Sequence, residues 1–167
     1  MISGTVAVAQ NQIVQPAFAI TFGSTRNLSD NDGNSFDPQV DVSSSNVYTV
    51  WADNTKGDGD TFFRRSSDAG NSFHSIVDLS NNVAGEATDQ KVTKIGNNVY
   101  VVWSENGDVF FKRSTDNGAH FGSISNLSNN DGDSFNPQMD LHGSNVYIVW
   151  QDKTPGNFDI LFRKGVD

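Results

Sequence analysis

An apolar run with the motif Val-Tyr-x-Val-Trp recurs three times along the chain, at residues 47–51, 99–103 and 146–150. β-branched and aromatic residues dominate it, which is typical of β-strands. Each run is followed by a turn and by a second apolar run of the type Phe-Phe-Arg-Arg. In the middle copy the turn contains Asn106-Gly107, a strong hairpin signal. The pattern predicts three antiparallel strand pairs and almost no helix.

Two further strands complete each repeat. One precedes the motif and begins at Gln39, Gln90 or Gln138, after a loop rich in Asp, Asn and Gly. The other follows an Asp-containing turn and ends in Leu-Ser. The three tryptophans recur after 52 and then 47 residues. A four-stranded unit of this length predicts a blade of a β-propeller, hence an all-β fold with three blades per chain. A β-sandwich has the same periodicity and remains an alternative.

The repeat also predicts where the units begin and end. Residues 22–29 match residues 121–128 in register, so they predict an outer strand separated from its own unit. Blade 1 is then expected over 30–80, blade 2 over 81–128, and blade 3, without an outer strand, over 129–167. The span from 22 to 167 corresponds to three repeats in permuted order. Such a permutation allows the first strand of a ring to close the last blade.

Residues 1–21 differ in composition from the repeats. Ala17-Phe18-Ala19 resembles a signal-peptidase site. However, no basic residue precedes the apolar run, and Gln10-Asn11-Gln12 interrupts it. An ordered N-terminal arm is therefore favoured over a signal remnant. No segment reaches the roughly 20 apolar residues that a transmembrane helix requires.

Composition excludes several classes of function. The net charge is −9, with 18 Asp and only two Glu, which argues against a nucleic-acid partner or a basic membrane-binding patch. The chain contains no cysteine, so disulfides and thiolate metal sites are excluded.

Two turns carry a family resemblance. Residues 66–73 read Ser-Ser-Asp-Ala-Gly-Asn-Ser-Phe, and residues 114–121, which begin 48 positions later, read Ser-Thr-Asp-Asn-Gly-Ala-His-Phe. Both resemble the Asp-box of the sialidase-type BNR propellers, and the likeness extends over 22–167. It implies a propeller, usually six-bladed, often secreted or at the cell surface. It also implies a structural role in the turn for Ser66, Asp68, Gly70, Phe73, Ser114, Asp116, Gly118 and Phe121.

The sialidase chemistry does not follow from this resemblance. Those enzymes use three arginines that hold a carboxylate, a Tyr nucleophile with a Glu partner, and an Asp acid/base. Here the tyrosines and most arginines lie at positions repeated in each unit, where packing is the simpler explanation. These residues are Tyr48, Tyr100, Tyr147, Arg64, Arg65, Arg113 and Arg163, and Arg26 is the remaining arginine. We therefore expect no catalytic residue, since a fold does not fix a function.

Other candidate sites are polar. The first strand of each unit is expected to face the propeller axis, where a glycan or peptide could bind. The candidates there are Gln39, Asp41, Gln90, Gln138 and Asp140. Calcium is an alternative at 30–34 and 130–133, but these segments lack EF-hand spacing, so turn chemistry is favoured. His74, His120 and His142 lack the spacing of a zinc site, and no metal or other cofactor is expected.

Three blades leave two apolar faces without a neighbour. Two chains would give six blades, the usual number in the resembling family, with two-fold symmetry. The sequence thus predicts a homodimeric ring in which residues 22–29 complete the third blade of the other chain. The expected function is a non-catalytic glycan- or protein-binding scaffold, extracellular or at the cell surface. A glycoside hydrolase with a site at the chain junction and a purely structural repeat are the alternatives.

Overall fold

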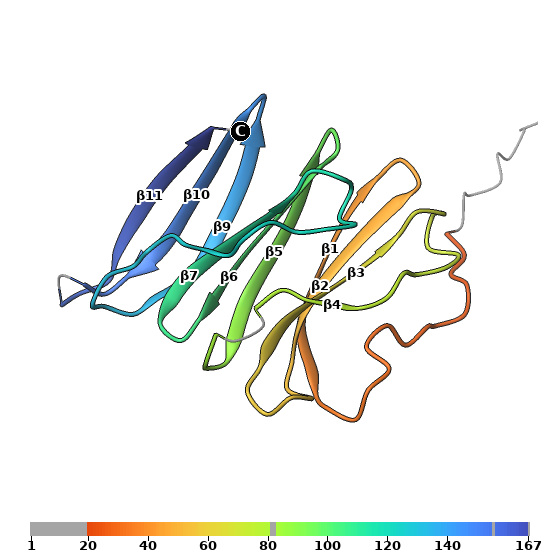
Figure 1. The fold of residues 1–167 in the computed structure, drawn as a ribbon, viewed down its shortest axis with the longest axis horizontal. Coiled ribbons are helices and arrows are strands. Elements are labelled where there is room, and N and C mark those ends of the chain that lie inside the picture. The colour runs from red at the N-terminus through yellow and green to blue at the C-terminus, as the bar shows by residue number, and fades with distance from the viewer. Residues whose placement is uncertain (1–19, 81–82, 155, 167) are drawn as a thin grey trace, which may run out of the picture.

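The computed structural model describes residues 20–80, 83–154 and 156–166, in which every regular element is a β-strand. Residues 1–19, to which the arm or signal remnant belongs, lie outside the described part. Figure 1 shows three antiparallel sheets side by side, and they do not close into a barrel. The expected all-β class and its repeated sheet units are confirmed.

Each sheet is a meander of consecutive strands. The first sheet contains β1 (Ser35–Ser43), β2 (Asn46–Asp53), β3 (Asp60–Ser66) and β4 (Val77–Asp78). The middle sheet contains β5 (Ala87–Ile95), β6 (Asn98–Glu105), β7 (Asp108–Ser114) and β8 (Ser125–Asn126). The last sheet contains β9 (Ser134–His142), β10 (Asn145–Asp152) and β11 (Asp159–Val166). The Val-Tyr-x-Val-Trp motif occupies the second strand of every sheet.

The outer strands are short, since β4 and β8 contain two residues each. Their flanking residues nevertheless remain attached to the third strand. At the middle sheet, the Gly122 amide donates to the Arg113 carbonyl at 2.9 Å, and the Leu127 amide donates to the Val109 carbonyl at 2.7 Å. Side-chain hydrogen bonds from Ser and Asn replace part of the strand ladder there.

The hairpin between β6 and β7 forms where Asn-Gly predicts it. Asn106 has φ of 50° and Gly107 has φ of 78°, so both central residues have the left-handed conformation of a type I′ turn. Glycine and asparagine adopt this conformation at low cost.

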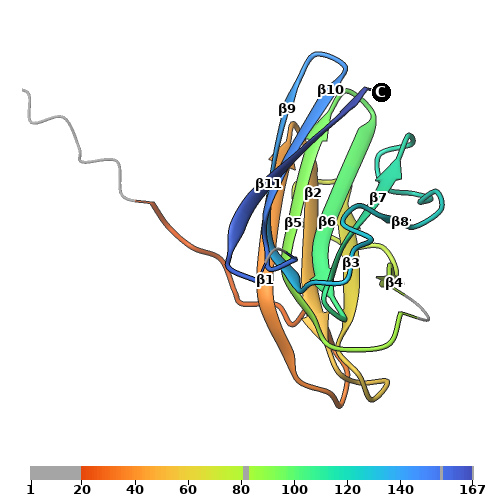
Figure 2. The ribbon, with the colours of Figure 1, turned by 90° about the vertical axis from the view of Figure 1, so that its left-hand side faces the viewer.

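Two apolar cores hold the three sheets face to face. The core between the first and middle sheets includes Tyr48, Phe63 and Trp103. The core between the middle and last sheets includes Tyr100, Ile148 and Trp150. Alternate residues of β6 face opposite neighbours, so the middle sheet is covered on both sides. In Figure 2 the first strands β1, β5 and β9 lie on one side, and β4 and β8 lie on the other.

Candidate functional site

The two Asp-containing turns have the same hydrogen-bond pattern. The buried Ser66 hydroxyl accepts from the Gly70 amide at 2.9 Å and donates to Asp68 at 2.8 Å. Ser114 makes the equivalent bonds to Gly118 and Asp116, at 2.9 and 2.8 Å. The positive φ of Gly70 (82°) and Gly118 (77°) suits glycine at both places. Each turn connects the third strand of a sheet to its outer strand.

Hydrogen bonds keep both turn carboxylates ionised. Asp68 accepts from the side chain and the amide of Ser72, at 2.6 and 2.8 Å, which lowers the pKa of Asp68 to about 2. The amide and ring of His120 lower the pKa of Asp116 in the same way. These carboxylates organise the turn, and their hydrogen-bonding capacity is used within it.

The two turns differ in how their aromatic residue packs. Phe121 of the middle sheet meets Phe63 of the first sheet edge to face, with ring centroids 4.9 Å apart. Phe73, the equivalent residue of the first sheet, instead lies beneath the guanidinium groups of Arg26 and Arg64, at 6.0 and 5.9 Å. The turn aromatic therefore packs on the preceding sheet where that sheet exists.

The structure corrects the alignment of the first strands. In the strand pairing, Gln39 lies opposite Val50, and Gln138 lies opposite Val149. The residue at that place in the middle sheet is Lys91, which lies opposite Val102. Gln90 is one residue earlier, so the sequence alignment of Gln90 with the other two glutamines was wrong.

The β-bulge in each first strand shows which residues are equivalent. Asp37, Asp89 and Asn136 have φ of 51°, 58° and 54°, so each first strand bends at an equivalent left-handed residue. The next residue is Pro38, Gln90 or Pro137. Gln90 is fully buried, and its amide nitrogen lies 3.5 Å from the Thr61 hydroxyl. Gln90 is thus a packing residue between the first and middle sheets.

The remaining axial candidates lie in two rows across β1, β5 and β9. One row contains Gln39, Lys91 and Gln138. The other contains Asp41, Thr93 and Asp140, which lie opposite Tyr48, Tyr100 and Tyr147 respectively. Gln39, Gln138 and Asp140 are exposed, and the other three are half-buried. We call these six residues the inner-strand rows. Gln39, Lys91 and Gln138 each precede the motif tyrosine of their repeat by nine residues, so this spacing identifies Lys91 from the sequence alone.

A carboxylate beneath each tryptophan was missed by the sequence analysis. Asp53, Glu105 and Asp152 each follow a motif tryptophan by two residues. The indole N–H donates to the carboxylate at 3.3, 2.7 and 3.3 Å respectively. The signal Trp-x-Asp/Glu is visible in all three repeats. These buried carboxylates close the end of each second strand.

Two of these carboxylates also hold the Asp/Asn/Gly loops that were considered for calcium. Asn31 donates to Asp53 at 2.8 Å, and Asn130 donates to Asp152 at 2.7 Å. Ser35 and Ser134 add hydroxyl donors to the same carboxylates, and Thr55 and Thr154 add backbone amides. Within residues 20–80, 83–154 and 156–166, no group of three His, Cys, Asp or Glu is placed to hold a metal.

The pKa values of these carboxylates differ. Burial alone would raise the pKa of Asp53, but the bonds from Thr55, Asn31 and Ser35 hold it at about 2. Glu105 is also buried, and burial raises its pKa to about 7 despite the bond from Trp103. The negative charges of Asp60 and Asp78 act in the same direction. The middle sheet thus contains a carboxyl that titrates near neutrality.

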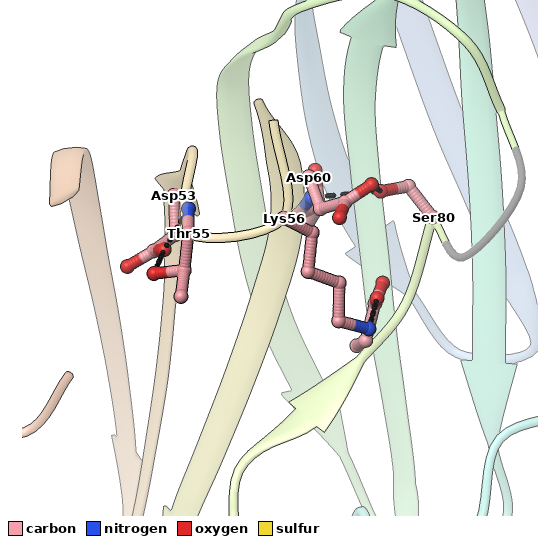
Figure 3. A network of polar contacts seen from close by, with 7 residues as sticks. Asp53, Thr55, Lys56, Asp60 and Ser80 are labelled. Carbon is pink, nitrogen blue, oxygen red and sulfur yellow. Dashed lines mark hydrogen bonds and ion pairs between the residues drawn. The ribbon is translucent and has the colours of Figure 1, made fainter. Parts of the chain in front are cut away.

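Figure 3 shows the polar contacts near this position. Asp60 accepts a hydrogen bond from Ser80 at 3.2 Å, and Lys56 forms an ion pair with Asp78 at 2.6 Å. Burial raises the pKa of Asp60, and Asp78 adds to that effect. These contacts join the loop after β2 to the outer strand of the first sheet.

The arginines do not form a carboxylate-binding triad. Arg64 donates to the Leu28 and His74 carbonyls, both at 2.7 Å, and Arg163 donates to the Leu127 carbonyl at 2.7 Å. Arg26 donates to the Asn71 carbonyl at 2.9 Å. Among the tyrosines, Tyr48 and Tyr100 are buried in the two cores. These side chains connect segments of the fold.

The two end faces of the stack are apolar and largely exposed in the part of the chain that the structure describes. On the first sheet, Val40 and Val42 are 62% and 59% exposed. On the last sheet, Ile160 and Phe162 are 69% and 61% exposed. A groove of about 450 Å³ lies on the first face, with Leu28, Val40 and Trp51 among its lining residues. A cavity of about 190 Å³ lies between the middle and last sheets, next to Tyr100 and Phe111.

Comparison with known proteins finds distant structural likeness but no family. No family model matches the chain, and no curated protein matches it. The crystal structure of polysaccharide lyase Uly1 is similar with a TM-score of 0.40 and 13% identity, over 75% of this chain and 28% of the lyase chain. None of the described residues forms a helix able to cross a membrane. The resemblance to sialidase-type propellers therefore stays a prediction.

Proposed function

We propose that this chain is a non-catalytic, sialidase-like half-propeller that acts as a binding scaffold when two copies complete a ring. The observation that carries this proposal is the pair of uncovered apolar end faces. Exposed apolar patches of this kind mark interaction surfaces. In this arrangement the three sheets are three blades, and the inner-strand rows face the axis.

The repeat supports a second copy as the partner. At the junction of the middle and last sheets, Phe111 and Val109 of one sheet belong to the same apolar core as Met139 and Leu141 of the next. The same positions on the uncovered faces hold Phe162 and Ile160 at one end, and Val40 and Val42 at the other. The packed junction thus serves as a template for the junction between two copies.

Light scattering coupled to size exclusion tests the assembly. We expect a particle of about 36 kDa, twice the 18.2 kDa of one chain. Because each copy carries a net charge of −9, association should strengthen as salt screens the repulsion between copies. A particle that stays at the mass of one chain at high concentration would overturn the proposal.

The ligand-binding part of the proposal concerns the inner-strand rows. Amide, carboxylate and amine groups side by side suit a glycan or the main chain of a peptide, because both offer hydrogen-bond donors and acceptors. A glycan array and a peptide library probed with the dimer test this idea. Lys91→Ala and Gln138→Ala should abolish any signal, and Ser75→Ala on the outer surface should preserve it.

The alternative function for the same two-copy assembly is a glycoside hydrolase. The backbone bonds of Arg64 and Arg163 argue against an arginine triad. A fluorogenic sialoside assay on the dimer tests the point directly. Turnover that Arg64→Ala or Arg113→Ala abolishes would favour the enzyme. If the dimer neither turns over the sialoside nor binds any glycan or peptide, a purely structural role is the remaining interpretation.

A further inference from the structure

The end of the segment 22–29 has the same turn as the end of the docked outer segment of the middle sheet. Asn27 accepts from the Asp30 amide at 3.1 Å and from the Ser29 hydroxyl at 3.2 Å. Asn126 of the middle sheet accepts from the Asn129 amide at 2.9 Å and from Ser128 at 3.5 Å. Asp30 and Asn129 have φ of 45° and 43°. Six of the eight residues in 22–29 are identical to those in 121–128.

The turn around Asn126 shows that an outer segment binds a carboxylate at the start of the third strand. Asn126 and Ser128 donate to the two oxygens of Asp108 at 2.8 and 2.7 Å. Ser128 also accepts from the Val109 amide at 3.0 Å. Asp108 opens β7, and Asp159 is its equivalent at the start of β11. The last sheet therefore presents the same carboxylate to an Asn-x-Ser segment.

A docked outer segment also packs an aromatic ring on the preceding sheet. Phe22 precedes Asn27 by five residues, as Phe121 precedes Asn126, yet Phe22 is 91% exposed. Phe121 packs on Phe63 of the preceding sheet, and Gly118 of its turn lies against the same ring. Phe111, the equivalent of Phe63, lines the cavity of about 190 Å³.

This cavity is continuous with an existing interface. Tyr100, Val146 and Ile148 line it and also belong to the core between the middle and last sheets. The cavity lies beside Phe111 and Arg113 of the middle sheet. At the other junction, the equivalent residues Phe63 and Arg65 lie beside Phe121 and Gly118 of the next sheet's turn, so the cavity occupies the place of that turn. An aromatic ring from an outer segment would complete the core there.

The segment of the same copy lies at the opposite end of the molecule. Arg64 donates to the Leu28 carbonyl just as Arg163 donates to the Leu127 carbonyl, at 2.7 Å in both cases. Residues 22–29 therefore lie beside the first sheet in the place of an outer strand of a preceding sheet. Figure 1 shows this segment and β11 at opposite ends of the row of sheets. Only another copy can bring its segment to β11.

We propose that residues 22–29 of a second copy dock along β11, with Phe22 filling the cavity beside Phe111 and with Asn27 and Ser29 binding Asp159. The proposal rests on the two-copy assembly above and names its contacts. By two-fold symmetry each copy gives one segment and receives one. At each junction the contacts that hold the segment are thus one buried aromatic ring and one carboxylate that accepts two hydrogen bonds.

Engineered cysteines test the docking, because the natural chain contains none. At the middle sheet Ser125 lies opposite Phe111, so the proposal places Arg26 opposite Phe162 of the other copy. We expect Arg26→Cys and Phe162→Cys chains, mixed and oxidised, to form a mixed disulfide. Arg26→Cys mixed with Ile95→Cys is the matched control and should not. Particles of about 36 kDa without the mixed disulfide would overturn the docking alone, whereas monomers would overturn the assembly as well.

A truncation of the anchor gives an independent measurement. Burying a Phe side chain gives about a tenfold or larger gain in affinity. With two such contacts per dimer, Phe22→Ala should raise the dissociation constant about a hundredfold. Ile95→Ala, at the hairpin between β5 and β6, should leave the dissociation constant unchanged. Because Phe22 is exposed in one copy, the thermal stability of the monomer should not change. An unchanged dissociation constant for Phe22→Ala would overturn the proposal.

Discussion

The middle sheet and the two flanking sheets share the apolar residues of the repeated motif, but they differ in what covers them. Phe63 on the first sheet faces the middle sheet and is fully buried, whereas its equivalent Phe162 on the last sheet is 61% exposed. Tyr100 is buried between the middle and last sheets, and its equivalent Tyr147 is only half-buried. The chemistry of a repeated residue is therefore set by its neighbours. The repeat unit alone does not determine it.

The carboxylates beneath the tryptophans show the same contrast. Asp53 and Asp152 lie on flanking sheets and receive several hydrogen bonds from their own loops, which lower their pKa values. Glu105 occupies the equivalent place on the middle sheet, where burial raises its pKa to about 7. Ser35 and Ser134 lie opposite Asp53 and Asp152 and donate to them, but the residue opposite Glu105 is Ala87, which has no hydroxyl. The desolvation of the Glu105 charge therefore dominates its pKa.

The largest expected effect concerns the two equivalent phenylalanines. Phe63→Ala should reduce the free energy of unfolding by about 3–5 kcal/mol, because it leaves a cavity in a packed core. Phe162→Ala should cost less than about 1 kcal/mol in a dilute, monomeric sample, because its ring is exposed. Urea denaturation of both variants measures the difference. Equal losses would show that the last sheet is covered within one copy.

The second prediction concerns pH. The pKa of Glu105 is raised above its ordinary value near 4.5, so the folded state holds this proton more tightly than the unfolded chain. Stability from this group is therefore complete below about pH 4.5 and is lost as pH rises to about 7, by about 3 kcal/mol at most. Glu105→Gln should remove this loss in denaturation curves recorded between pH 4.5 and 8.

Asp152→Asn provides the comparison for the Glu105 variant. The pKa of Asp152 is lowered, so its contribution is present above the ordinary pKa of Asp and disappears only as pH falls further. This variant should therefore keep the wild-type slope between pH 4.5 and 7. A Glu105→Gln protein with that same slope would contradict the assigned titration.

The two Asp-containing turns should contribute equally to stability. Ser66→Ala and Ser114→Ala should each cost about 1–2 kcal/mol, because the Gly70 or Gly118 amide then loses its hydroxyl acceptor. Thermal unfolding measures both variants, with Ser75→Ala as the exposed control. A much larger cost at one turn would show that packing against the neighbouring sheet contributes there.

The smallest effect is expected at the surface ion pair. Lys56 and Asp78 lie 2.6 Å apart, but the Lys56 side chain is 55% exposed. Lys56→Ala should change stability by less than about 1 kcal/mol. The difference from wild type should shrink in 1 M salt, where the charges are screened. A loss that salt does not reduce would point to packing of the Lys56 aliphatic stem.

Much of the fold follows from the repeated motif. The second and third strands form where the apolar runs predict them, since alternating side chains fit a sheet that packs on its neighbours. The outer strands β4 and β8 are short, and Ser80 and Ser128 hydroxyls accept from amides of β3 and β7 in place of part of a regular ladder. The alignment of Gln90 failed because Gln90 occupies the position of Pro38 and Pro137, directly after the left-handed residue of the bulge, so matching the three glutamines by type places it one residue out of register.

By itself the sequence determined the all-β class, the three repeated sheet units and the residue types in each, because periodic side-chain patterns encode strands locally. Only the tertiary structure decided which copies of a residue are buried, which carboxylate titrates near neutrality, and that residues 22–29 and β11 lie at opposite ends. Burial and pKa depend on neighbours that are distant along the chain, and a residue repeated three times meets different neighbours each time.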